Sequence, residues 1–102
     1  MTRIRDLASL EETPHADVFP EAEPKTVRLR LDAGERIPPH RHPDRDVVFY
    51  LVDGAVDLEL DGESHPLEAG EIARFAGTRE VSPVAREPST ALVVLAATAR
   101  SE

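Results

Sequence analysis

Short stretches of alternating apolar and polar residues, separated by turn-forming residues, dominate this sequence from about residue 26 onward. In the stretch 26–32, Val27, Leu29 and Leu31 fall on one side of an extended chain, because side chains of a strand alternate with period two. Residues 55–60 alternate in the same way. Glycine and proline recur too often for long helices. The pattern therefore predicts an all-β sandwich or barrel.

A continuous apolar run, residues 47–52, differs from these alternating stretches. Such a run is typical of a strand that is covered on both faces, or that is partly covered by another subunit. Strand parity turns Phe49 inward and Tyr50 outward. Further short strands are expected near residues 72–75 and over residues 91–96.

Two Asp-Gly pairs, Asp53–Gly54 and Asp61–Gly62, flank the alternating stretch 55–60. Glycine accepts the positive φ that a tight type I′ turn demands. The pairs predict two hairpin turns, and with them a meander of short strands in the middle of the chain.

The first 24 residues have a different character, with three prolines, no glycine and only scattered apolar residues. We expect an N-terminal arm (1–24), a barrel (25–98) and a short C-terminal tail (99–102). The arm either docks on the barrel or a partner subunit, or is a loosely held tail. Docking is favoured because Val18 and Phe19 would otherwise be exposed apolar surface.

Composition and charge exclude several classes of protein. The length of 102 residues suits one domain, and the absence of cysteine removes disulfides, thiolate metal sites and cysteine nucleophiles. A net charge of −8, with 20 acidic against 12 basic residues, disfavours nucleic acid and anionic membranes as partners. The acidic composition fits either ordinary solubility or adaptation to salt. No apolar signal region follows the N-terminus, so we expect a cytoplasmic protein.

The segment 34–46 contains the pair His40 and His42, separated by one residue. On an extended segment these two side chains project to the same face, and neighbouring prolines favour extended geometry. Two adjacent imidazoles are half of a first-row transition-metal site. The alternative is a pair of solvated histidines in a surface loop.

The spacing of Gly34, His40, His42 and Gly54 resembles the first motif of the cupin superfamily. That motif reads Gly, five residues, His, any residue, His, three or four residues, Glu, six residues, Gly. The resemblance covers about residues 26–96. It implies a small antiparallel β-barrel of the double-stranded β-helix or jelly-roll kind, usually a homodimer. It also implies a divalent transition metal, such as zinc, iron, nickel or manganese, in the mouth of the barrel.

The glutamate of this first motif has no clear counterpart in the chain. Counting back from Gly54 places Val47 at its position, whereas counting forward from His42 places Asp46 there. Val47 shares the inward face with Phe49, so Asp46 would need a bulge to point inward.

Residues 70–80 resemble, more faintly, the second motif of the cupin superfamily. Counting from Gly77 places Glu80 at the position of the family's metal-binding histidine, whereas counting from Gly70 places Val81 there. We favour the count from Gly77, since the turn needs a glycine at a fixed distance before the ligand. The expected metal ligands are therefore His40, His42 and Glu80, with Asp46 as a fourth candidate.

Two other histidines, His15 and His65, have no second ligand in register and are expected to be solvated. A ligand-binding cavity would be lined by four apolar residues: Val47, Phe49, Leu58 and Val81.

Three functions stay open on the sequence. The first is a metal-dependent oxygenase or isomerase acting on a small polar molecule. The second is a non-enzymatic barrel that has lost its metal and binds or senses a small molecule. The third is a structural or storage role. Fold alone does not decide among them.

Overall fold

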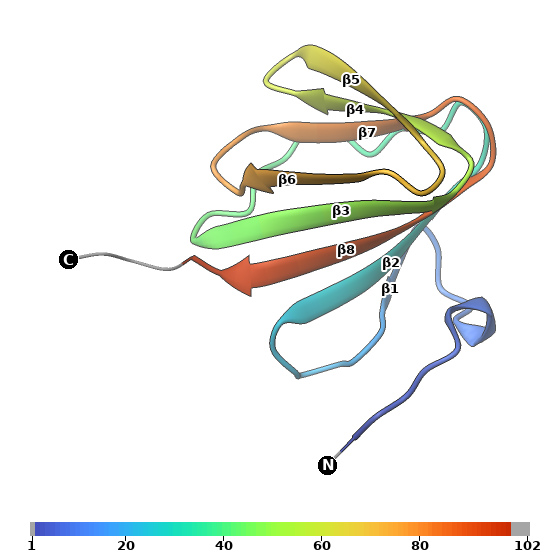
Figure 1. The fold of residues 1–102 in the computed structure, drawn as a ribbon, viewed down its shortest axis with the longest axis vertical. Coiled ribbons are helices and arrows are strands. Elements are labelled where there is room, and N and C mark those ends of the chain that lie inside the picture. The colour runs from blue at the N-terminus through green and yellow to red at the C-terminus, as the bar shows by residue number, and fades with distance from the viewer. Residues whose placement is uncertain (1, 99–102) are drawn as a thin grey trace.

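The computed structural model of the protein describes residues 2–98, which form two antiparallel β-sheets that share one core (Figure 1). The larger sheet has the strand order β1-β2-β8-β3-β6, and the smaller has the order β5-β4-β7. The elements are a 3-10 helix, η1 (Leu7–Ser9), and strands β1 (His15–Asp17), β2 (Lys25–Leu31), β3 (Arg45–Asp53), β4 (Ala55–Leu60), β5 (Glu63–Glu68), β6 (Ile72–Ala76), β7 (Val81–Ala85) and β8 (Ser89–Ala97). The all-β barrel expected from the sequence is confirmed. The predicted tail, residues 99–102, lies outside the described residues.

The core lies between the two sheets and follows the strand periodicity. On β3, Val47, Phe49 and Leu51 are buried, whereas Tyr50 between them is 37% exposed. On β4, Leu58 is fully buried and faces this core. The inward and outward faces predicted from the alternation are therefore confirmed for both strands.

The predicted hairpin turn at Asp53–Gly54 is wrong, and so is the meander that it implied. Strand β3 pairs with β6 and β8 in the larger sheet, whereas β4 belongs to the smaller sheet. Gly54 (φ 95°) is instead the corner where the chain passes from one sheet to the other, and any side chain there would collide with Pro88 and Ser89. In the sequence, a sheet corner and a hairpin turn require the same glycine.

The second pair, Asp61–Gly62, does close a hairpin. It joins β4 to β5, and both residues have positive φ (51° and 83°), as a type I′ turn requires. The pairing of β4 with β5 begins at Leu60 and Glu63, directly on either side of the turn.

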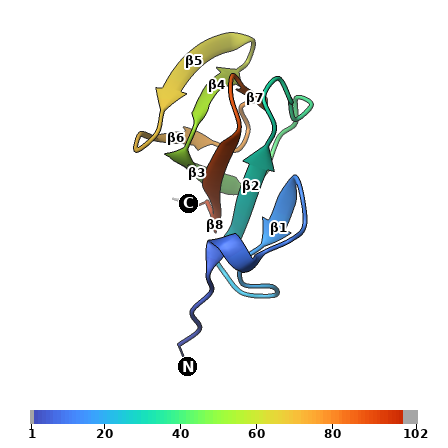
Figure 2. The ribbon, with the colours of Figure 1, turned by 90° about the vertical axis from the view of Figure 1, so that its right-hand side faces the viewer.

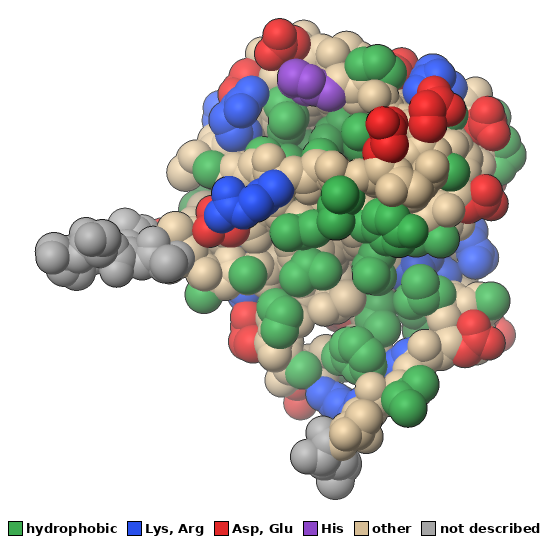
Figure 3. All heavy atoms as spheres, in the orientation of Figure 1, with side chains coloured by type: hydrophobic (Ala, Val, Ile, Leu, Met, Phe, Trp, Pro, Cys, Tyr) green, Lys and Arg blue, Asp and Glu red, His purple; other side chains and the backbone are tan. Residues whose placement is uncertain are grey.

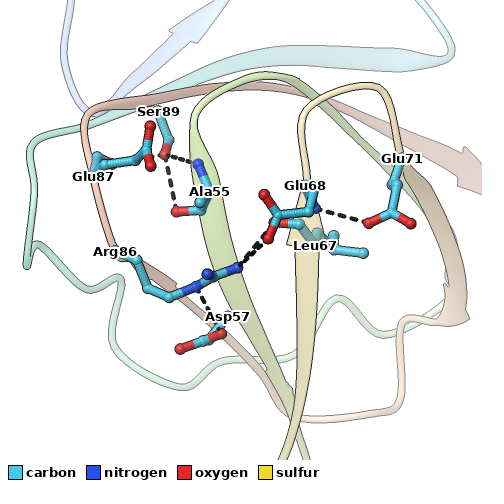
Figure 4. A network of polar contacts seen from close by, with 8 residues as sticks. All are labelled: Ala55, Asp57, Leu67, Glu68, Glu71, Arg86, Glu87 and Ser89. Atoms are coloured by element: carbon cyan, nitrogen blue, oxygen red, sulfur yellow. Dashed lines mark hydrogen bonds and ion pairs between the residues drawn. The ribbon is translucent and has the colours of Figure 1, made fainter.

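Side-chain contacts fasten the start of β4 on both sides (Figure 4). The hydroxyl of Ser89 accepts a hydrogen bond from the Ala55 amide (3.1 Å). Arg86, which follows β7, pairs with Asp57 on β4 (3.1 Å) and with Glu68 on β5 (3.3 Å). These contacts link all three strands of the smaller sheet at the end where the corner lies.

The N-terminal arm docks against the outer side of the larger sheet, where η1 and β1 lie beside β2 (Figure 2). Leu10, Ala16 and Val18 are buried there and form a second apolar cluster with Leu92 of β8. The arm therefore covers Val18, which would be exposed apolar surface if the arm did not dock.

A single buried arginine holds the arm in place. Arg28 of β2 has no exposed surface, and its guanidinium donates to the backbone carbonyls of Leu7 (3.1 Å), Leu10 (3.2 Å) and Glu12 (2.6 Å). Burial lowers the pKa of Arg28. A guanidinium suits this position because its fork of donors reaches several carbonyls at once.

Beyond the arm, the outer face of the larger sheet stays open. Hydrophobic side chains gather over the part of this face formed by β3, β6 and β8 (Figure 3). Tyr50, Val52 and Ile72 are exposed there, Ile72 by 63%. Within residues 2–98, no helix is both long enough and apolar enough to cross a membrane.

Candidate ligand-binding cavity

A cavity of about 60 Å³ lies under the inner face of the larger sheet, covered by β7 and by the segment that leads into β3. Three of its lining residues are histidines: His15, His40 and His42. The rest of the wall is apolar and is made by Val27, Leu29, Ile37, Val47, Phe49, Phe75, Val81, Pro83, Val93 and Leu95. The cavity is thus an apolar chamber with all its ionisable side chains being imidazoles.

Backbone contacts fix the segment that carries the two paired histidines. His40 forms a two-way antiparallel bridge with Val81 (N···O 3.0 and 2.8 Å), and the His42 amide donates to the carbonyl of Gly77 (2.8 Å). A β-carbon on Gly77 would collide with the carbonyls of His42 and Arg45, so glycine permits this close approach. The glycine of the second motif therefore positions a histidine of the first.

The two imidazole rings stand edge to face, with centroids 4.7 Å apart and planes at 90°. Nδ1 of His40 lies 2.8 Å from the carbonyl oxygen of Pro38. Because a carbonyl only accepts hydrogen bonds, Nδ1 carries the proton, which leaves Nε2 of His40 with its lone pair free. Within residues 2–98, His42 has no hydrogen-bond partner for its ring.

The third histidine, His15, comes from the arm. It pairs with Leu29 across β1 and β2, and Leu29 faces the core, so strand pairing turns His15 to the same side. Its ring borders the cavity on one side and solvent on the other. The sequence predicted that His15 would be solvated. Only the nonlocal pairing of β1 with β2 brings it to the cavity.

Burial is the main cause that lowers the pKa of both His15 and His42, and the neighbouring His40 lowers both further. For His15, the Asp17 carboxylate acts in the opposite direction. Because these pKa values lie below the ordinary value of about 6.5, the neutral form of both rings is favoured at pH 7.

The two carboxylates expected to be metal ligands do not line the cavity. Asp46 pairs with Arg74 (3.2 Å) on the outer face of the sheet, and the pairing of β3 is regular at this residue, so no bulge turns it inward. Glu80 lies 4.0 Å from Arg41, and its amide donates to Asp61. Their assignment as ligands stays a prediction, and the arrangement of these side chains does not favour it.

Val47 and Val81, which the alternative counts placed at the ligand positions, do line the cavity beside His40 and His42. Phe49 lines it as well, whereas Leu58 packs in the core and does not reach it. Across residues 2–98, no group of three or more histidine or carboxylate side chains is arranged to hold a metal ion. The three imidazoles that border the cavity are not arranged as a metal-binding group, and Val47 and Val81 supply no donor atom, so the cavity does not fit a metal site.

The protein is thus a small two-sheet β-barrel with an apolar cavity that is bordered by His15, His40 and His42. The cupin domain family matches residues 27–96, and the chain belongs to this family. His40 and His42 lie within the matched region, whereas His15 lies before it.

Individual known proteins are similar to this chain in sequence or in structure. The chain is 45% identical to the polyketide synthase CurC of Streptomyces cyaneus over 38 residues, which are 37% of this chain and 25% of that one. The match thus spans a quarter of that relative. The structure of KdgF from Halomonas sp. is similar with a TM-score of 0.73 and 25% identity, covering 91% of this chain and 88% of that chain.

The fold alone is shared with more distant structures. The Cupin_2 domain of an XRE family transcriptional regulator from Enterobacter cloacae gives a TM-score of 0.75 at 18% identity, covering 83% of this chain and 96% of that one. The Cnp3 cupin domain of Schizosaccharomyces pombe gives 0.79 at 13% identity, covering 91% and 68%. Because proteins with such different names share this fold, the fold does not identify the activity of this chain.

Proposed function

We propose that this protein is a cupin barrel that binds a small molecule without a metal ion. The observation that carries the proposal is the pair of valines, Val47 and Val81, which line the cavity beside His40 and His42 and which the alternative counts along the sequence assign to ligand positions of the family. Each valine side chain gives the cavity an apolar surface and offers no atom that could ligate a metal ion. The cavity is therefore built to exclude water from an apolar group.

The size of the cavity limits what enters it. A cavity of about 150 Å³ holds a benzene ring, whereas this one measures about 60 Å³. It has room for an aliphatic group of a few carbon atoms. A polar end of the same ligand would lie at the histidines, where Nε2 of His40 and the ring of His42 have no hydrogen-bond partner among residues 2–98.

A metal-dependent oxygenase or isomerase is the competing function. It would need a metal held by His40 and His42 together with at least one carboxylate or further imidazole. Asp46 and Glu80 are engaged with Arg74 and Arg41 outside the cavity. The further imidazole at the cavity, that of His15, is not arranged with His40 and His42 to hold a metal ion. The binding barrel needs no such rearrangement, which is why we favour it.

The test is a titration of Zn²⁺ into untagged protein and into the double variant Val47→Glu/Val81→His. The variant recreates the family's ligand types on the cavity wall, so it should bind Zn²⁺ at least about tenfold more tightly than the wild-type protein. Zn²⁺ should also raise the melting temperature of the variant more than that of the wild type, because a ligand stabilises the state that binds it.

Two single variants test whether the wild-type protein binds Zn²⁺ through a carboxylate. Under the proposal, Glu80→Ala and Asp46→Ala leave the weak Zn²⁺ binding of the wild-type protein unchanged. If the wild type binds Zn²⁺ as tightly as the double variant, and loses that binding in Glu80→Ala or Asp46→Ala, the protein is a metal-binding cupin and the proposal is overturned.

A further inference from the structure

Among residues 2–98, those that line the cavity carry no permanent charge. Its ionisable side chains are the imidazoles of His15, His40 and His42, and the rest of the wall is apolar. Burial lowers the pKa of His15 and of His42, which favours the neutral form of both rings. A charged group that leaves water for such a wall loses its hydration and gains no ion pair in return. The chamber therefore suits an uncharged ligand.

The charges just outside the cavity do not select an ion either. Two cations act on His42, and each is already paired with a carboxylate: Lys25 with Asp17 (3.6 Å) and Arg45 with Glu23 (2.7 Å). Asp17 also acts on His15 with a negative charge, and with His15 and Glu12 it lines a second hollow. Charges of both signs thus lie near the rings, so that neither an anion nor a cation is favoured.

The neutral ring of His40 requires a hydrogen-bond donor from the ligand. Its Nδ1 proton is donated to the carbonyl of Pro38 (2.8 Å), which leaves Nε2 with a lone pair and no proton. A ligand without an N–H or O–H group would leave this acceptor unpaired in apolar surroundings, which costs free energy. The polar end of the ligand therefore carries a donor.

The ring of His42 adds the complementary requirement. A neutral imidazole has one N–H group and one lone pair, and within residues 2–98 the ring of His42 forms no hydrogen bond. The centroids of the His40 and His42 rings are 4.7 Å apart, so one polar group meets both rings. A primary amide answers both, because its N–H donates to Nε2 of His40 while its carbonyl oxygen accepts from the N–H of His42.

We propose that the ligand of this cavity is an uncharged aliphatic molecule whose polar end both donates and accepts hydrogen bonds, as a short primary amide does, and that this end lies between His40 and His42. The inference rests on the proposed function, since it needs the apolar chamber to hold the aliphatic end. His15 borders the site from the arm, which lies before the region matched by the family.

The experiment compares three probes of nearly equal shape: butanamide, 2-pentanone and butanoate. The ketone has a methyl group in place of the amide NH₂, so it keeps the acceptor and loses the donor, whereas butanoate adds a negative charge. Each is titrated into the full chain at pH 8, where imidazoles are neutral, with EDTA present to remove metal ions. Binding is followed by NMR shifts of the histidine and phenylalanine rings. Butanamide should bind at least about tenfold more tightly than butanoate, because burial of an unpaired charge is costly.

The role of His40 is measured by the ratio of butanamide to 2-pentanone affinity. Free amide and free ketone are hydrated differently, but this difference is the same for every variant and cancels when ratios are compared. His40→Ala and His40→Phe both remove the lone pair of Nε2, and His40→Phe keeps an aromatic ring. Each should lower the ratio roughly three- to tenfold, as expected for loss of one hydrogen bond.

His65→Ala is the matched histidine control, because His65 lies on β5 and does not line the cavity. It should leave the ratio at the wild-type value. A general loss of stability, or a changed shape of the chamber, would weaken butanamide and 2-pentanone alike and also leave the ratio unchanged.

Each outcome supports or overturns the assignment. If neither His40 variant changes the ratio, no donor of the ligand meets Nε2, and the assigned class of ligand is wrong while the binding function stands. Tighter binding of butanoate than of butanamide would make the ligand an anion and overturn the inference in the same way. If none of the three probes binds, the inference is wrong, and the Zn²⁺ titration decides the proposed function separately.

Discussion

At the scale of single residues, the site depends on backbone positions as much as on the histidines themselves. His42 is held by the hydrogen bond that its backbone amide donates to the carbonyl of Gly77, and the chain passes so close to Gly77 that no β-carbon fits there. Val81 is fixed by its two-way bridge to His40. The orientation of the rings is therefore a property of the backbone around them.

Gly77→Ala should displace the loop that carries His42. The added β-carbon meets backbone carbonyls, which cannot move aside as a flexible side chain can. We expect a loss of about 1–3 kcal/mol in the free energy of unfolding, as for overpacked positions, together with changed NMR shifts of the His40 and His42 rings. Gly70→Ala is the control, because its φ of 94° costs strain but no atom lies within 4 Å. It should lower stability and leave the shifts of the two rings unchanged; equal changes of these shifts in the two variants would contradict this role of Gly77.

At the scale of elements, the N-terminal arm is the segment for which the sequence left open whether it docks or is loosely held. Its docking depends on Arg28, whose three carbonyl partners span residues 7–12. It also depends on the pairing of β1 with β2, which involves only three residue pairs. A short edge strand of this kind is held mainly by its side-chain contacts.

Arg28→Ala should release the arm while the barrel stays folded. Three carbonyls, one of them in a buried and two in part-buried hydrogen bonds, lose their donors. Each unsatisfied group costs about 1–3 kcal/mol when it stays buried, so the arm is expected to detach and hydrate them. Hydrogen exchange followed by mass spectrometry should show faster exchange of amides in residues 7–18 and little change in β3 and β8. Arg30→Ala is the matched control. Unchanged exchange of the arm in Arg28→Ala would show that the apolar cluster alone holds it.

At the scale of the whole molecule, the exposed outer face of β3 and β6 is the unexplained surface. Tyr50, Val52 and Ile72 form an apolar area that the arm does not reach. A small barrel has a limited core, and an apolar sheet face of this kind favours association. We propose a homodimer in which two copies pack through this face, so that residue pairs repeat across a twofold axis.

Light scattering at micromolar concentration should then give about twice the monomer mass of 11.2 kDa. Ile72→Glu should shift the protein to the monomer, because a charge in the middle of an apolar interface is costly to bury. The residue is 63% exposed in the single chain, so the substitution leaves the fold intact. Ile4→Glu, on the arm and 88% exposed, is the control that should stay dimeric. A monomeric wild-type protein would refute the dimer.

Local physical chemistry explains what the sequence by itself determined. Alternation placed the inward faces of β2, β3 and β4, because a strand has a fixed period. The spacing of glycines and histidines around Gly34 and His42 identified the family that the match over residues 27–96 confirms. Strands with weak alternation escaped prediction: β5 has only Leu67 buried, and β1 is three residues long.

Only the tertiary structure decided what pairs with what. An Asp-Gly pair has the same sequence in a hairpin and at a sheet corner, so only the strand order identifies Asp53–Gly54 as a corner. The two ways of counting toward the second motif could not be separated along the chain, whereas the bridge from His40 places Val81 in the cavity. His15 reaches its place through the pairing of β1 with β2 and the buried guanidinium of Arg28. These contacts join residues far apart in the sequence, and no local pattern encodes them, because they form only when the closing barrel repays the entropy of bringing the segments together.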